Sequence, residues 1–128
     1  MYLTLVSREE FGPVRKLGYI YHNLANLHIE TNTLDSAVWY LDKSIILKNE
    51  IGNDRELSSD YFIYGDIYMK QEKFEKAVEA YEKVRELNFD NAIGDIDFEV
   101  SLKLSYAYYA LSDHKKAAEN FVTYFEQC

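Results

Sequence analysis

Hydrophobic and polar residues follow one another along most of this chain with the spacing of amphipathic helices. Between Tyr61 and Val84, large apolar residues recur at i, i+3, i+4 and i+7, and Glu and Lys fill the positions between them. The pattern predicts seven helices, over residues 1–10, 13–31, 34–49, 54–71, 74–88, 95–111 and 114–127. Pro13 suits the first turn of a helix, and Asn53, Asp54 and Asp95 suit helix starts. The chain is therefore expected to be all-α.

The pattern also repeats. The runs LDSAVWYL, FEKAVEAY and HKKAAENF align on three alanines that are 40 residues apart, Ala37, Ala77 and Ala117. In the same phase upstream, a large residue is followed by a small one in the pairs Leu24–Ala25, Tyr64–Gly65 and Leu104–Ser105. A small residue lets a second helix approach closely, and the aromatic residues can fill the space beside that contact. Each unit is thus predicted to be a helical hairpin.

The central unit resembles the tetratricopeptide repeat family, whose pattern is matched by Tyr61, Tyr64, Gly65, Tyr68, Phe74, Ala77 and Tyr81. The resemblance implies a right-handed α-solenoid of antiparallel helix pairs with about three repeats. The spacing of 40 residues exceeds the family's usual ~34. Helices longer by roughly a turn and a half per pair are expected to absorb the difference.

The register predicts a single domain over 1–128, with repeat units at 13–52, 53–92 and 93–128 after a partial helix at 1–11. Because the array begins inside a repeat, we expect a segment of a longer array. The last helix ends in FVTYFEQC, which is too apolar for the polar cap of a finished solenoid. A standalone protein that dimerises through Phe121, Val122, Tyr124 and Phe125 is the alternative.

Composition narrows the range of partners. The chain has 128 residues and a formal charge of −8, which argues against nucleic acid and anionic membranes because both are bound largely through Lys and Arg. About 18 apolar residues in a row occur nowhere, and the N-terminal residues do not look like a secretion signal. The lone cysteine, Cys128, excludes an intrachain disulfide, and a cytoplasmic location is expected.

Enzyme signatures are absent. No phosphate-binding loop, dinucleotide fingerprint, HExxH or GxSxG motif occurs, so no catalytic residue, cofactor or metal site is expected. His28 and His114 replace large residues of the repeat and are expected to pack. The acidic run DNAIGDIDFE lacks the spacing of a calcium loop and suits helix capping. Trp39 is expected to pack against a neighbouring helix, with an exposed partner anchor as the alternative.

What remains is a binding surface. In a solenoid of this type the first helix of each pair lines the concave groove. Ten residues on that side are the candidate contacts: Tyr19, His22, Asn23, Asn26, Phe62, Asp66, Met69, Lys103, Tyr106 and Tyr109. The same register adds Glu30, Ser59, Ile63, Glu99 and Leu102. Asn amides can bond a peptide backbone, and aromatic rings can form pockets for its side chains.

Two branches of the family bear on the ligand. The chaperone-docking branch uses a basic clamp, of which only Lys103 has a counterpart here, whereas Asn23 and Asn26 are similar to groove asparagines of bacterial peptide-sensing regulators. The leading hypothesis is a non-enzymatic scaffold that binds a protein or peptide in its groove. The alternative is a structural or oligomerisation module of a larger bacterial regulator or sensor, a homodimer through its final helix. A third, chemistry elsewhere in a longer chain, stays open.

Overall fold

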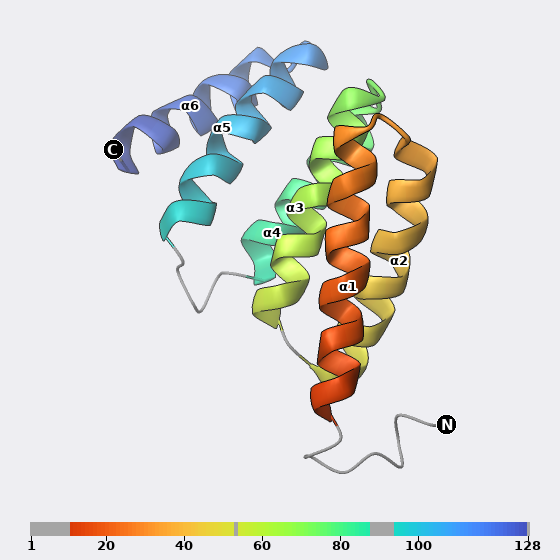
Figure 1. Ribbon diagram of the computed structural model, residues 1–128. Helices are drawn as coiled ribbons and strands as arrows, with labels where there is room; N and C mark the ends of the chain where they lie inside the picture. The colour runs from red at the N-terminus through yellow and green to blue at the C-terminus, as the bar shows by residue number, and fades with distance from the viewer. Residues whose placement is uncertain (1–10, 53, 88–93, 128) are drawn as a thin grey trace. The chain divides into compact units, whose positions relative to one another are not determined.

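A computed structural model describes residues 11–52, 54–87 and 94–127 (Figure 1). These residues form six helices and no strand: α1 Phe11–Glu30, α2 Leu34–Ile51, α3 Asp54–Lys70, α4 Phe74–Leu87, α5 Gly94–Ala110 and α6 His114–Gln127. The all-α prediction is confirmed, with boundaries that differ from the predicted ones by two residues or fewer. The expected seventh helix, at 1–10, falls outside the described residues, as do Asn53 and Cys128.

The period of 40 residues is visible in the backbone. The first helices of the three pairs end at Glu30, Lys70 and Ala110, and the second helices begin at Leu34, Phe74 and His114. The turns between them place Asn32, Glu72 and Ser112 in the left-handed region, with φ of 61°, 59° and 64°. In each turn the next amide donates to the carbonyl five residues earlier, as Thr33 does to His28 at 2.8 Å. The three hairpins therefore have the same type of turn.

In the first pair the longer period is taken up by the helices, as expected. Helices α1 and α2 have 20 and 18 residues, whereas α4 and α6 have 14 each. The turns inside the pairs have only three residues each. The extra residues of the first pair therefore lengthen its packed helices and leave its turn unchanged.

Contacts group the described residues into two compact units, residues 1–60 and 61–128, and each is considered by itself. In the first unit, α1 and α2 lie side by side (Figure 1). Its buried apolar residues are Ala25, Ala37, Leu41, Ile45 and Leu57. Helix α2 ends at Gly52, whose φ of 81° suits glycine, and the Gly52 amide donates to the Lys48 carbonyl.

The second unit contains the rest of α3 with α4, α5 and α6. Its core is the cluster Ala77, Tyr81, Val84, Val100, Leu104, Tyr108 and Ala117. Gly65 lies directly under Tyr81, because a Cβ built on Gly65 would be 2.3 Å from the ring. The prediction that a small residue permits close helix packing is therefore confirmed at this position.

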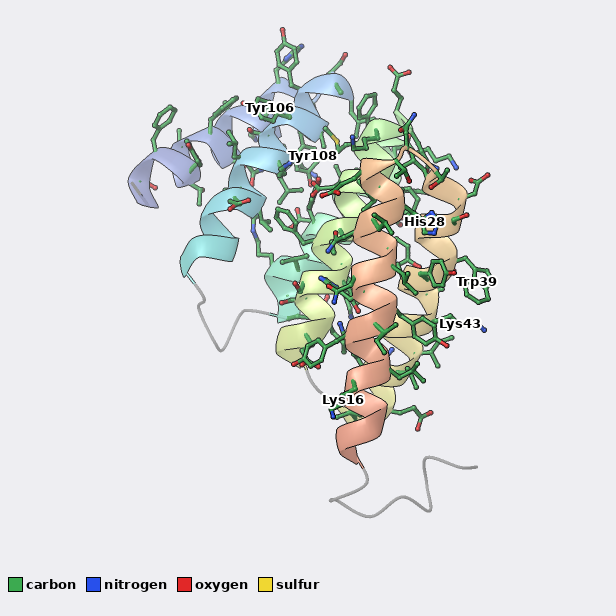
Figure 2. The ribbon with its side chains drawn as sticks, in the orientation of Figure 1. Lys16, His28, Trp39, Lys43, Tyr106 and Tyr108 are labelled. Carbon is green, nitrogen blue, oxygen red and sulfur yellow. The ribbon has the colours of Figure 1, made fainter. Side chains whose placement is uncertain are left out.

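Three aromatic predictions have different outcomes. His28 packs as expected, because its ring stacks on Tyr40 at 5.3 Å and Nδ1 lies 2.7 Å from Thr33 Oγ1. His114 is exposed at the start of α6 and touches Tyr109 edge-on, so it does not enter the core. Trp39 is 54% exposed, which corrects the expectation that it packs against a neighbouring helix. Figure 2 shows the indole projecting outward from α2.

Trp39 is exposed because its side chain lies on the side of α2 opposite the buried face. Ala37 and Leu41, on either side of it in sequence, occupy the buried face, and a residue two positions from each lies away from that face. The indole edge rests on Tyr40 at 5.0 Å, and the Lys43 ammonium lies 4.9 Å from the indole centroid. The ring is therefore held by its own helix.

Candidate functional site

Three of the predicted groove residues meet in the second unit. Lys103 Nζ, from α5, lies 3.2 Å from Asp66 Oδ1, from α3. The same ammonium lies 5.9 Å from the centroid of the Phe62 ring. We call these three residues the α3–α5 cluster. Its side chains are half-buried, so a cation, a carboxylate and an aromatic ring are all within reach of a ligand.

The α3–α5 cluster is anchored to the core by Tyr81. Its hydroxyl donates to Asp66 Oδ1 at 2.6 Å, and its ring contacts Phe62 edge-on at 5.7 Å between centroids. Burial, and then the neighbouring Asp66 charge, raises the pKa of the Tyr81 hydroxyl far above its usual range. The hydroxyl therefore stays a donor, which holds the Asp66 carboxylate in place.

Beyond the cluster, α5 presents two exposed aromatic side chains. Tyr106 is 50% exposed and meets the Phe121 ring edge-on at 6.0 Å, and Tyr109 is 64% exposed. Met69 is half-buried against the core cluster. Ile63, which the register adds to the groove side, is buried, so its side chain is not available to a ligand.

In the first unit, the predicted residues of α1 behave differently from one another. The Tyr19 hydroxyl donates to the Glu56 carboxylate. His22 Nδ1 lies 2.7 Å from Asp60 Oδ1, and its side chain is 19% exposed. Asn23 is exposed and Asn26 is half-buried. His22 is thus held by Asp60, and Asn23 is the more exposed of the two amides.

A buried polar network behind His22 was not found by sequence reasoning. Asp60 is fully buried and accepts from Ser44 Oγ at 2.7 Å and Lys48 Nζ at 3.0 Å. Ser44 Oγ also lies 3.3 Å from the Gly18 carbonyl oxygen. A signal was present, because Ser44 and Lys48 interrupt the apolar face of α2 that begins with Ala37 and Leu41. That face could have been expected to bury an acid.

A second feature that the sequence did not indicate is a cleft on α3 and α4. Its volume is about 450 Å³, and its lining consists of Tyr61, Tyr64, Tyr68, Lys76, Glu79, Ala80 and Lys83. Tyr64 and Tyr68 stack at 5.7 Å, and the Lys76 ammonium lies 5.8 Å from the Tyr68 centroid. The repeat pattern predicts only a packing role for these tyrosines.

Within the described residues, no group of three His, Cys, Asp or Glu side chains is arranged to hold a metal ion. Nor does any helix in that part of the chain have both the length and the apolar character needed to cross a membrane. The side chains of the acidic run, as far as residue 98, lie outside the described part.

The fold and these surfaces define a class: a protein built from helical hairpins that repeat along the chain. The tetratricopeptide repeat family model matches residues 59–91, which contain most of α3 and all of α4. Residues 59–91 therefore form a tetratricopeptide repeat. This fold generally serves as a scaffold for contacts between proteins.

A solved structure supports the fold over nearly the whole chain. The N-terminal domain of stress-induced protein-1 (STI-1) from C. elegans superposes with a TM-score of 0.76. The match covers 89% of this chain and 86% of the other, at 17% sequence identity. No curated protein sequence matches the chain significantly. At this identity the likeness concerns the fold, and the choice of partner has to be argued from this chain's own residues.

Proposed function

We propose that the chain is a non-enzymatic interaction module that binds an extended peptide segment of a partner protein on its first-helix surface. The observation that carries the proposal is the α3–α5 cluster. Asp66 and Lys103 come from two successive first helices and sit in contact on a half-buried surface. If Asp66 served only to keep the surface hydrated, its carboxylate would not need to be fixed by the buried Tyr81 hydroxyl.

The chemistry of the cluster fits a peptide main chain. A carboxylate accepts hydrogen bonds from backbone N–H groups, and an ammonium donates to backbone carbonyls. Because Asp66 and Lys103 already neutralise each other, the pair presents both functions without a large net charge. The fit is therefore to an extended segment with free backbone groups.

The aromatic residues around the cluster fit the side chains of such a segment. Phe62 lies beside Lys103, and Tyr106 and Tyr109 are exposed further along α5. Tyrosines combine a large apolar surface with a polar end and are frequent anchors at interfaces. In the first unit, considered by itself, Asn23 and Asn26 of α1 offer amides that both donate and accept. The ligand expected is a peptide with bulky apolar side chains.

The test begins with peptides selected from a random library displayed on phage against the whole chain. A selected peptide is then titrated by isothermal calorimetry against wild type, Lys103→Ala and the double variant Asn26→Ala/Tyr106→Ala. We expect each variant to bind at least ~10-fold more weakly, about 1.4 kcal/mol, with unchanged helicity by circular dichroism.

The matched control is Glu79→Ala, an exposed change on the α3–α4 cleft, which should leave the affinity unchanged. If Glu79→Ala weakens binding and Lys103→Ala does not, the peptide binds the tyrosine-lined cleft and the proposed surface is wrong.

A further inference from the structure

Helix α6 carries an apolar stripe that the second unit does not cover. Ala118, Phe121, Val122 and Phe125 are spaced i, i+3, i+4 and i+7 and so share one side of the helix. Val122 is 56% exposed and Phe125 is 66% exposed. Another side of α6, with Ala117 and Asn120, is the one buried within the unit. Folding of this unit therefore uses one face of α6 and leaves Ala118, Val122 and Phe125 of the stripe exposed.

The last ring of the stripe, Phe125, already packs against its neighbours. Phe125 stacks on Phe121, with ring centroids 6.4 Å apart, and meets Tyr124 edge-on at 5.3 Å. Phe121 in turn contacts Tyr106 of α5. A side chain that is held before binding loses little conformational freedom when it becomes buried. Phe125 is thus suited to be an anchor of an interface.

The charges beside the stripe indicate which partner it fits. Lys115 and Glu126 are both exposed and lie at opposite ends of the stripe. They are eleven residues apart, which is close to three full turns, so they lie on the same edge. If a second α6 packs antiparallel, Lys115 approaches the partner's Glu126, and symmetry forms this pair twice. If the second α6 were parallel, Lys115 would lie beside the partner's Lys115, and Glu126 beside the partner's Glu126.

We propose that the stripe binds a second copy of this chain, with the two α6 helices antiparallel. Val122 of each copy packs near the two-fold axis, Phe125 packs on the stripe of the other copy, and the Lys115–Glu126 pairs set the direction. This surface differs from the α3–α5 cluster, so the proposal stands apart from the proposed function. The pairing buries two anchors on each side and leaves the polar edges in water.

Sedimentation equilibrium of the whole chain over a wide concentration range tests the proposal. Wild type should show a concentration-dependent dimer. Phe125→Glu and, independently, Val122→Glu should be monomeric throughout, with unchanged helicity because both positions are exposed. Ile46→Glu is the matched control, an equally exposed apolar residue on α2, and should dimerise like wild type. A monomeric wild type, or a dimer that survives Phe125→Glu, would overturn the proposal.

Charge reversal tests the antiparallel direction. Lys115→Glu alone should weaken the dimer, because it places two carboxylates together at each end. Adding Glu126→Lys should restore the association, since both pairs are then rebuilt with exchanged signs. If the double variant associates as weakly as Lys115→Glu does, the antiparallel arrangement is wrong.

Discussion

At the scale of the residue, Tyr81 connects the core of the second unit to its candidate binding surface. The side chain is fully buried, and its ring lies directly over Gly65. Its edge-on contact with Phe62 and its hydrogen bond to Asp66 both reach the α3–α5 cluster. A change that moves this ring therefore affects packing and the surface together.

The Tyr81–Gly65 contact predicts opposite outcomes for two glycine substitutions. Gly65→Ala should destabilise the fold by about 1–2 kcal/mol, because the new methyl group clashes with a fully buried ring and outweighs the ~1 kcal/mol gain in helix propensity. Gly18→Ala is the control, since its methyl group meets only the Lys48 side chain at 3.6 Å. Urea unfolding should show Gly18→Ala at least as stable as wild type. A stabilised Gly65→Ala would contradict the close contact.

Tyr108 predicts a loss of stability at alkaline pH. Burial, followed by the hydrogen bond to Glu82 and the charge of that residue, raises the Tyr108 pKa to about 12. An unfolded tyrosine titrates near 10, so the folded state holds its proton more tightly. This contribution is fully present below pH ~10 and is lost as pH rises through about 12. The unfolding free energy, measured in urea, should fall less between pH 9 and pH 11 for Tyr108→Phe than for wild type. An equal difference would contradict the prediction.

At the scale of the element, a single acid joins the helices of the first unit. Asp60, in α3, contacts His22 of α1 and both Ser44 and Lys48 of α2. The carboxylate is fully buried and the Lys48 side chain is almost so. A buried ion pair of this kind contributes less to net stability than to the choice of one arrangement, because desolvation offsets much of the attraction.

Removing one partner of that pair should be costly. Asp60→Ala leaves the Lys48 ammonium buried without its counter-ion, and we expect a loss of roughly 3–5 kcal/mol in unfolding free energy. The matched control is Glu86→Ala, which breaks an exposed pair with Lys83 and should change stability by less than about 0.5 kcal/mol. Thermal unfolding of both variants measures the contrast. Similar losses for the two would show that the Asp60 network is not a stability determinant.

At the scale of the whole molecule, the two proposals use separate surfaces of one repeat protein. The α3–α5 cluster lies on two first helices, and the apolar stripe lies on a second helix. Lys103 contacts Asp66 and Phe62, whereas Phe125 contacts Phe121 and Tyr124. Binding and association should therefore be separable.

This separation can be measured with two single variants. Lys103→Ala should weaken the binding of a selected peptide, and its sedimentation profile should be the same as that of wild type. Phe125→Glu should do the reverse, giving a monomer that binds the peptide with unchanged affinity. If Phe125→Glu also abolishes peptide binding, the two surfaces are coupled, and the Tyr106–Phe121 contact is the connection that would explain it.

Helices, turns and their period could be predicted from the sequence because they depend on local order. The spacing of apolar residues determines the face a helix buries, so α2, α4 and α6 begin where predicted. Gly65 was also predictable, since a glycine within a helix indicates a close approach. The family pattern around Tyr61 to Tyr81 then implied the hairpin, and the match at residues 59–91 agrees with it.

Only the tertiary structure decided which polar and aromatic groups meet. Asp60 and Asp66 are six residues apart on one helix, yet the first is buried with Lys48 and the second is half-exposed with Lys103. Lys48 is 12 residues from Asp60, and Lys103 is 37 residues from Asp66. A periodic pattern does not predict which of such distant residues will pair. Periodicity determines the buried face, while side-chain neighbours across helices depend on the packed backbone.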